Sequence, residues 1–296
     1  MDNRFLFILF CSTIVLPLNS CGQKNRTIDF PYDLDRPKMN LELPKVLEEI
    51  SGLSHAEGNN VYCLQDEKGE LFLYNLDKGE IERQIPFGKP GDFEGIAKAG
   101  DRIYVLRSDG KLYSFQEPKT GNEIGEITQI YLELGSKCNA EGLGYDSGRN
   151  RLLVACKGES KKESVEKRFY GVDLGSDELK AVPLFSLSAA SLQNPANWIS
   201  RERYDNSGIP LRKVNTFNPS GIATHPITGD FYVLSSVGKL LVVLTHDGKI
   251  RQIVPLDPHR FIQPEGITFD MEGNLFISNE GRGDHAVIYK FSFSGL

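Results

Sequence analysis

One short pattern recurs five times along this chain and constrains its fold more than any other feature. A glycine follows Glu or Ser and precedes Ile or Leu in "EISGLSHA", "DFEGIAKA", "NAEGLGYD", "NPSGIATH" and "QPEGITFD". The glycines are Gly52, Gly95, Gly142, Gly221 and Gly266, separated by 43, 47, 79 and 45 residues. Periods of this size are typical of repeat architectures in which each repeat is one supersecondary unit. The fold prediction therefore starts from one repeated unit.

Short apolar runs follow each copy of the pattern and predict strands. After Gly95 come "RIYVLRSDG", "KLYSFQ" and "TQIYLEL", and comparable runs follow Gly52 and Gly221. They are rich in β-branched, aromatic and leucine residues and are bounded by Gly, Asp, Asn and Lys, which is the strand-and-hairpin signature. With the strand that the pattern itself opens, each unit has four antiparallel strands, as in a blade of a β-propeller. We therefore predict an all-β propeller.

The last unit indicates how the ring closes. The printed sequence stops at Leu296 one strand short of a complete blade, while "LELPKVLEE" at residues 41–49 precedes the first copy and belongs to no unit. We expect this segment to be the outer strand of the last blade. Pro44 is compatible with that place, because an outermost strand has one edge that needs no ladder donor.

The 79-residue interval sets the blade count. Residues 188–217 include Asn-Pro, Ser-Gly and a dense polar middle, with no apolar alternation beyond residues 209–214. This composition favours five blades with an insertion at about 188–217. Six blades is the alternative.

The N-terminal residues predict export. Arg4 precedes an apolar run at residues 5–18, which is too short to span a bilayer and is typical of a secretory signal. "LNSC", ending at Cys21, resembles the lipobox of bacterial lipoproteins. We expect a signal peptide at 1–20, a lipidated Cys21, a polar tether at 21–40 and the propeller at 41–296. "GQKN" after Cys21 lacks the Asp of inner-membrane retention and favours the outer membrane, facing the periplasm; a plain signal peptide with an unrelated Cys is the alternative.

Charge and cysteine content narrow the partners. The net charge of −6 provides no electrostatic reason to bind nucleic acid, so membrane attachment would come from the lipid. Cys63 and Cys156 lie in apolar runs and are predicted to be buried free thiols, with one disulfide as the alternative in an oxidising compartment. Cys138 is the remaining cysteine of the propeller segment. The spacing of these cysteines and of the histidines does not match a zinc site.

Propeller topology places the start of each innermost strand and the end of each second strand on one rim. We expect Glu94, Glu141 and Glu265 at the channel mouth there, with Ser51 and Ser220 at the equivalent positions. Crowded carboxylates need a cation or a proton, and oxygen ligands suit Ca²⁺ or Mg²⁺ better than zinc. The further ligand candidates on this rim are Asp66, Asp109, Asn139, Asn279 and Glu280. The glycines are predicted to be structural, because no side chain fits where the inner strands converge. For the glutamates the structural alternative is that they accept backbone N–H groups of the neighbouring blade.

The predicted insertion carries a second group of candidates. Its aromatic and guanidinium side chains are suited to hold a sugar or an anionic ligand. They are Trp198, Arg201, Arg203 and Tyr204. The alternative is that Trp198 packs the insertion onto the rim.

Several of these motifs together resemble a known family. The "EGI" and "EGL" openings, the strands "YVLSS" and "FISNEG", the lipobox and the length are similar to the SdiA-regulated family of exported bacterial β-propellers, and at longer range to NHL-repeat and esterase-like phytase propellers. The same opening occurs in gluconolactonase-type propellers, whose metal is held at the channel mouth by Glu, Asn and Asp. By that resemblance Glu94, Glu141 or Glu265 would be the Glu, and Asn279 or Asn139 the Asn. The resemblance implies the fold rather than an activity.

Three functions are compatible with the sequence. The first is a lipid-anchored envelope protein that binds a ligand or partner at the channel mouth, with a divalent cation. The second is a metal-dependent hydrolase of phosphoesters or lactones, although no G-x-S-x-G, H-E-x-x-H, P-loop or Rossmann motif is present. The third is a protein-interaction scaffold whose Glu ring is structural.

Overall fold

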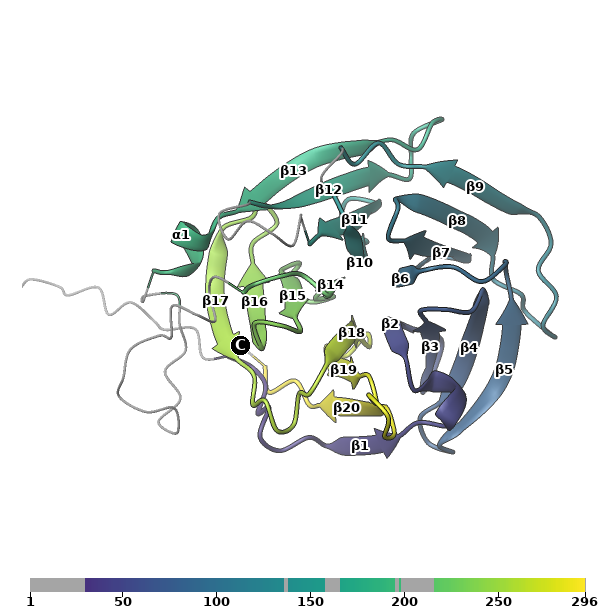
Figure 1. Cartoon of the computed structure of the whole chain (residues 1–296), viewed down its shortest axis with the longest axis horizontal. Coiled ribbons are helices and arrows are strands. Elements are labelled where there is room, and N and C mark those ends of the chain that lie inside the picture. Colours follow the sequence, from purple (N-terminus) through teal and green to yellow (C-terminus); the bar gives the residue numbers. More distant parts are fainter. Residues whose placement is uncertain (1–29, 136–137, 158–165, 195–196, 198–215, 296) are drawn as a thin grey trace, which may run out of the picture. The chain divides into compact units, whose positions relative to one another are not determined.

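Five four-stranded antiparallel sheets surround a common axis in the computed structural model (Figure 1). The structure describes residues 30–135, 138–157, 166–194, 197 and 216–295. Blade 1 consists of β2 (Ile50–His55), β3 (Asn60–Gln65), β4 (Glu70–Asn75) and β5 (Glu80–Pro86). Blade 2 consists of β6 (Phe93–Ala99), β7 (Arg102–Arg107), β8 (Lys111–Gln116) and β9 (Ile127–Tyr131). Blade 3 consists of β10 (Ala140–Asp146), β11 (Arg151–Cys156), β12 (Lys167–Asp173) and β13 (Ala181–Leu187).

The other two blades complete the ring. Blade 4 consists of β14 (Gly221–Thr224), β15 (Phe231–Ser235), β16 (Leu240–Leu244) and β17 (Ile250–Pro255). Blade 5 consists of β18 (Pro264–Phe269), β19 (Leu275–Asn279), β20 (Val287–Phe291) and β1 (Met39–Glu42). The described residues also include a 3₁₀ turn, η1 (Lys45–Leu47), and a short helix, α1 (Ala189–Leu192). The predicted five-bladed β-propeller is confirmed.

Tight hairpins connect the strands within a blade. Ala99 pairs with Arg102 across a two-residue turn, and Gly100 in that turn has a φ of 61°. Glycine adopts this left-handed conformation without a steric penalty, and short hairpin loops favour residues that can do so.

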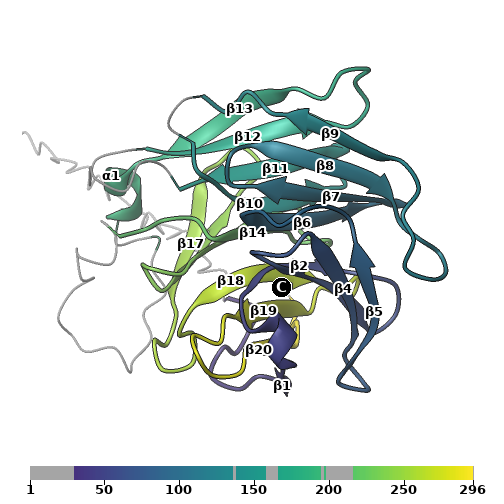
Figure 2. The same ribbon diagram turned by 45° about the vertical axis from the view of Figure 1, so that its right-hand side comes forward.

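Successive blades stand beside one another around the ring (Figure 2), and apolar side chains pack between them. One buried cluster joins Leu71 and Ile85 of blade 1 to Ile103 and Val105 of blade 2. Others join blade 4 to blade 5 and blade 3 to blade 4. The inner strands are therefore apolar on both faces, whereas the outer strand β5 alternates exposed and partly buried positions for most of its length.

The N-terminal strand closes the ring, as predicted. β1 pairs antiparallel with β20, from Met39 opposite Lys290 to Glu42 opposite Val287. Its bounds differ from the predicted 41–49: the strand ends at Glu42, and Pro44 precedes η1 instead of lying in the strand. Proline without an N–H donor is well suited to the start of a helical turn.

Packing begins ahead of residue 41. Tyr32 is 4% exposed and Leu34 is fully buried in the cluster between blades 4 and 5. The Tyr32 hydroxyl donates to the Gly273 carbonyl at 2.6 Å. The expected polar tether is therefore packed from Phe30 onward. The expected signal peptide, Cys21 and residues 22–29 lie outside the described residues.

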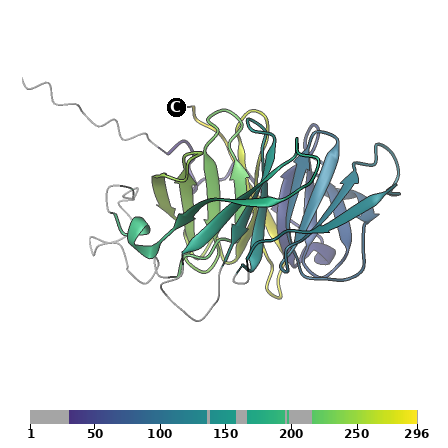
Figure 3. The ribbon, with the colours of Figure 1, turned by 90° about the horizontal axis from the view of Figure 1, so that it is seen from above.

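β10 of blade 3 contacts β14 of blade 4 directly, so the two blades are neighbours in the ring and the six-blade alternative is wrong. The innermost strands thus contact one another in the ring order β2, β6, β10, β14, β18. The rim where these five strands begin is called the motif face. Figure 3 shows the blades from the side. Among the described residues, no helix is long and apolar enough to cross a membrane.

Candidate functional site

Four of the five Glu and Ser residues of the repeated pattern lie at an irregularity of the innermost strand, whereas Ser220 precedes β14, whose pairing with β15 is regular. The pairing with the second strand shifts register between Ile50 and Gly52, between Phe93 and Gly95, and between Ala140 and Gly142. A comparable shift lies between Pro264 and Ile267. The extra residues at the first three shifts are Ser51, Glu94 and Glu141, and Glu265 lies within the fourth. A β-bulge frees its extra residue from the ladder and redirects its side chain.

The glycines of the pattern allow the inner strands to converge. A Cβ on Gly95 would lie 2.6 Å from the backbone nitrogen of Leu143 in the next blade. A Cβ on Gly221 would lie 2.4 Å from the Glu265 carbonyl oxygen. These distances leave no room for a side chain, so the architectural role predicted for the glycines is confirmed.

The channel is narrow and is closed by apolar side chains. Its lining includes four Glu or Ser residues of the pattern, which are Ser51, Glu94, Ser220 and Glu265. The apolar residue that follows the motif glycine in each innermost strand also lines it. These residues are Leu53, Ile96, Leu143, Ile222 and Ile267, all buried. The space open to the centre of a water molecule is about 10 Å³, enough for about one water. The candidate site is therefore the mouth on the motif face, and not a tunnel through the ring.

Glu141 has two side-chain partners. Its side chain is 4% exposed. Lys157 Nζ at the end of β11 lies 3.2 Å from Glu141 Oε1, and the Asn139 amide also donates to that oxygen. Burial raises the pKa of Glu141, and Lys157 opposes this rise. Glu141 is thus turned toward this pair, whereas Glu94 and Glu265 line the cavity.

Glu94 and Glu265 lie in surroundings that disfavour their charge. Burial, followed by the charges of Glu141 and Asp92, raises the pKa of Glu94 to about 9. Burial and the charges of Glu141 and Glu280 raise the pKa of Glu265 to about 8, against a hydrogen bond with Ser236 and the charge of Lys157. Both carboxyl groups therefore carry a proton at neutral pH unless another cation approaches.

A second group of acidic side chains continues along the rim where blades 5 and 1 meet. Burial and the charges of Glu49, Glu67 and Glu280 raise the pKa of Asp66 to about 6. Burial and Glu49 also raise the pKa of Glu280, whose carboxylate accepts a hydrogen bond from Gln263. The predicted rim residues Asp66 and Glu280 are thus brought together, and Glu280 links them electrostatically to Glu265.

Two buried polar side chains near the mouth have no hydrogen-bond partner among the described residues. Asn279, at the end of β19, is 4% exposed and neither atom of its amide is paired. The Ser51 hydroxyl lines the cavity and is 7% exposed, also without a partner. Buried polar atoms without partners cost free energy, and such atoms call for an explanation such as a bound water or ion.

Asp109 belongs to its own turn instead of the mouth. It pairs with Arg107 at 3.2 Å and accepts the Lys111 backbone N–H. Asn139 acts through Glu141, as described above. The predicted loop contacts Trp198, Arg201, Arg203 and Tyr204 lie outside the described residues.

Serine and threonine, and not the motif glutamates, supply the side-chain ties between inner strands that the described residues show. Ser54 of blade 1 accepts the Lys98 backbone N–H of blade 2. Thr268 of blade 5 accepts the His55 N–H of blade 1. The Ser220 hydroxyl of blade 4 donates to the Pro264 carbonyl of blade 5 at 2.8 Å. The side-chain partners of Glu141 belong to its own blade, whereas Glu265 of blade 5 has a hydrogen bond with Ser236 of blade 4. The structural alternative therefore gains support at Glu265 and not at Glu141.

The donor set suits a hard cation, although it is not arranged as a preformed metal centre. Carboxylate and amide oxygens are ligands of Ca²⁺ and Mg²⁺. Within the described parts of the chain, no three His, Cys, Asp or Glu side chains are grouped so that they could hold one metal ion.

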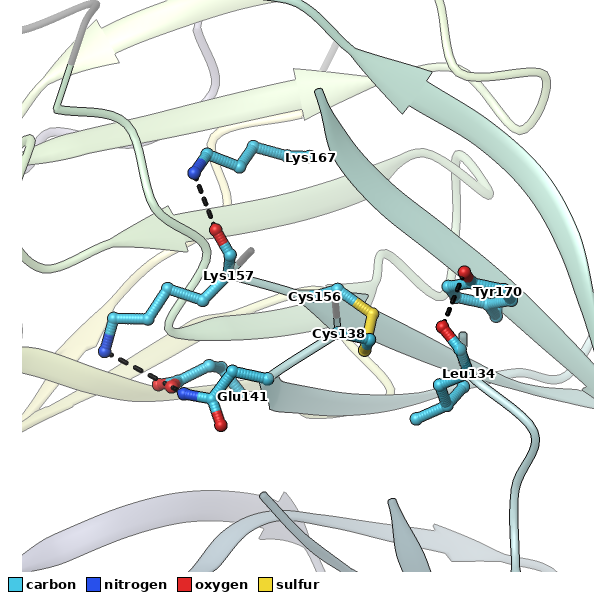
Figure 4. The surroundings of a disulfide bond; sticks show 8 residues. Leu134, Cys138, Glu141, Cys156, Lys157, Lys167 and Tyr170 are labelled. Carbon is cyan, nitrogen blue, oxygen red and sulfur yellow. Dashed lines mark hydrogen bonds and ion pairs between the residues drawn. A yellow bond between two sulfur atoms is a disulfide. The ribbon is translucent and has the colours of Figure 1, made fainter. Parts of the chain in front are cut away.

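A disulfide joins Cys138 to Cys156 beside this site (Figure 4). The prediction of a free thiol at Cys156 is therefore wrong and the disulfide alternative is right, while Cys63 is a buried free thiol. The connection before β10 returns to the end of β11, which brings the two cysteines together. Closing a loop of this length stabilises the folded chain by about 3 kcal/mol in the chain-entropy account.

Sequence reasoning did not single out Lys157 as a site residue. Its position at the end of a second strand places it on the motif face, but only the structure shows its ammonium group on Glu141. Lys167 was also missed. Its Nζ donates to the Lys157 carbonyl and to Asn218 Oδ1, both at 2.6 Å.

The fold and this mouth define a five-bladed β-propeller with an acidic rim. Residues 30–292 match the model of the SdiA-regulated family, and the chain belongs to that family. No match to a curated protein was found.

Solved β-propeller structures resemble the chain in fold. Glutaminyl cyclase from Myxococcus xanthus is 11% identical, with 86% of this chain and 94% of that chain covered at a TM-score of 0.56. The PQQ-bound aldose sugar dehydrogenase from Streptomyces coelicolor is 12% identical, with 87% and 97% covered at a TM-score of 0.54. At these identities the likeness concerns the fold alone.

Proposed function

We propose that this protein is a lipid-anchored β-propeller of the bacterial cell envelope that binds a ligand or partner at the mouth on the motif face, together with a divalent cation. The observation that carries the proposal is the crowding of Glu94, Glu141 and Glu265 around Lys157. Burial and neighbouring carboxylates raise the pKa of Glu94 to about 9 and that of Glu265 to about 8 even beside Lys157, so the three carboxylates need more positive charge than Lys157 supplies. A cation supplies that charge and replaces the protons.

The unpaired polar atoms of Asn279 and Ser51 add support. An ion or an ordered water near the mouth gives such atoms the partners that they lack. Ca²⁺ tolerates irregular oxygen geometry better than Mg²⁺, so Ca²⁺ is the preferred ion and Mg²⁺ the alternative. The apolar residues beneath the carboxyl groups limit the ligand to the open side of the ring.

A calcium titration tests the proposal. A site filled at a hundredfold excess over its Kd adds about 2.7 kcal/mol to the free energy of unfolding, which raises the Tm by roughly 5–10 °C. Glu94→Gln, Glu141→Gln and Glu265→Gln should each reduce this rise. Glu57→Gln is the matched control, because Glu57 is exposed in the β2–β3 turn on the opposite rim. An unchanged Tm in millimolar Ca²⁺ and Mg²⁺ would contradict the cation site and favour the scaffold alternative.

The hydrolase alternative uses the same carboxyl groups and is tested separately. Turnover of phosphoester or lactone substrates should be lost in the three Glu→Gln variants if these groups hold the ion and activate water. Activity that persists in all three variants removes them from the mechanism.

The proposed anchor is tested by fractionation. Cys21→Ser should move the protein from the membrane fraction to the soluble periplasmic fraction, because a lipid chain on Cys21 is the proposed attachment. A variant that stays with the outer membrane would contradict this part of the proposal.

A further inference from the structure

The Cys138–Cys156 disulfide lies one residue from each of the two side chains that hold Glu141 (Figure 4). Asn139 follows Cys138, and its amide donates to Glu141 Oε1. Lys157 follows Cys156, and its Nζ lies 3.2 Å from the same oxygen. The covalent bond thus joins the two segments that determine where this carboxylate points.

In the described part of the chain, backbone contacts also join these segments, and Ala140 pairs with Cys156. The ladder between β10 and β11 is irregular between Ala140 and Gly142, which is where Glu141 lies. Ahead of the irregularity, the Lys157 backbone N–H donates to the Asn139 carbonyl at 2.9 Å. Lys167 then holds the Lys157 carbonyl from β12. Because a bulge weakens strand pairing locally, the disulfide is the strong constraint on the relative positions of Asn139 and Lys157.

We propose that the Cys138–Cys156 disulfide is a positioning device that holds Glu141 together with Asn139 and Lys157, and that its reduction weakens ion binding at the mouth. The part of this inference that concerns ion binding rests on the proposed function. Partners that orient a metal ligand commonly change ion affinity by about 10- to 100-fold. The disulfide also agrees with the oxidising compartment expected of an exported protein.

Reduction by dithiothreitol is the direct perturbation. The reagent transfers two electrons and two protons to the disulfide, yielding two cysteine thiols and cyclic oxidised dithiothreitol. Cys138 is partly exposed and Cys156 is buried, so attack is expected at Cys138. Cys63 is a fully buried free thiol and remains unchanged.

Calorimetric titration of Ca²⁺ at 25 °C then compares the oxidised protein, the dithiothreitol-reduced protein and the Cys138→Ser/Cys156→Ser variant. The Kd should rise by about tenfold or more in both disulfide-free forms. Ile253→Val retains the disulfide and loses stability in blade 4, and its Kd should equal that of the unaltered protein. Equal affinity with and without the disulfide overturns the proposal. Circular dichroism of the reduced protein verifies that it is folded if the double variant is not.

A readout without any ion separates this inference from the proposed function. The rate of acetylation of the Lys157 amine, measured by mass spectrometry, should rise several-fold on reduction, while the exposed Lys249 reacts equally in both forms. Failure of the oxidised protein to bind Ca²⁺ or Mg²⁺ would overturn the proposed function. An unchanged acetylation rate at Lys157 would overturn the positioning role whatever the ion result.

Discussion

Lys157 Nζ lies 3.2 Å from Glu141 Oε1, at the point where the second strand of blade 3 returns to the motif face. Burial opposes the charge of the ammonium group, but Glu141, Glu265 and Glu94 outweigh this and raise the pKa of Lys157. One cation therefore interacts with all three motif glutamates. The charge state of Lys157 at the proposed binding mouth therefore depends on the glutamates of the repeated pattern.

Removing that cation should destabilise the protein. Lys157→Met leaves the buried Glu141 carboxylate without its ion pair. Breaking a fully buried pair costs about 3–5 kcal/mol, and the solvent exposure of Lys157 reduces this to about 1–2 kcal/mol. Urea unfolding at pH 7 measures the loss. Lys249→Met, which breaks an exposed pair with Asp247, should leave the free energy of unfolding nearly unchanged; an equal effect of both substitutions would contradict the assignment.

The raised pKa values of Glu94 and Glu265 predict lower stability in alkaline solution. The native state holds protons that the unfolded chain has released, so stability falls as the pH rises from about 4.5 through about 8 and 9. Each such group lowers the free energy of unfolding by up to about 1.4 kcal/mol per pH unit in this range, so the Tm should fall clearly between pH 6 and pH 8.

The corresponding variants test this slope. Glu94→Gln and Glu265→Gln imitate the protonated carboxyl group and should flatten the Tm profile between pH 6 and pH 9. Glu57→Gln should follow the profile of the unaltered protein. A profile of the same steepness in all three variants would show that these carboxyl groups do not cause the loss.

His225 predicts a loss of stability in acid. It is fully buried, and its Nδ1 accepts the backbone N–H groups of Ile227 and Thr228. Burial lowers the pKa of His225, against the charge of Asp230. Because the native pKa is below the unfolded value, the contribution is complete above about pH 6.5 and is lost as the pH falls below it.

His225→Asn keeps an acceptor for the turn and removes the titration. Asp270 has the same place in blade 5, four residues after the motif glycine, and its side chain also accepts a backbone N–H of the following turn, that of Asn274. The urea midpoint of the variant should fall less between pH 7 and pH 5 than that of the unaltered protein. Some slope should persist, because burial also lowers the pKa of His55. A slope in His225→Asn as steep as in the unaltered protein would refute the prediction.

The motif glycines predict a sharp contrast between two Gly→Ala substitutions. Gly95→Ala places a methyl group 2.6 Å from the Leu143 backbone nitrogen, and such overpacking costs about 3 kcal/mol. Gly125→Ala meets nothing within 4 Å and should be neutral or slightly stabilising. Thermal unfolding measures both. Similar Tm values would mean that the inner strands can separate without cost.

The repeated pattern was sufficient to predict much of the fold and part of the site. Periodic strands, the closing segment before Gly52 and the polar stretch after residue 188 led to five blades. Alternation and antiparallel topology placed Glu94, Glu265, Asp66 and Glu280 on one rim. These inferences succeed because local strand geometry repeats with a fixed period.

Other features depended on contacts that a sequence does not display. The pairing of Cys138 with Cys156 follows from the route of the connection before β10, and the ion pair of Lys157 with Glu141 follows from the directions of two side chains at a bulge. Phe30, Tyr32 and Leu34 alternate with Pro and Asp in "FPYDL", but the segment is too short and polar to show that it packs between blades 4 and 5.

The sequence by itself determined the repeating blade and the residue type that opens it, because hydrophobic alternation and turn chemistry are local. Only the tertiary structure decided which carboxyl groups share Lys157, which cysteines bond and where packing begins. These outcomes depend on distances between residues far apart in the chain, and such distances exist only once the five blades have closed into a ring.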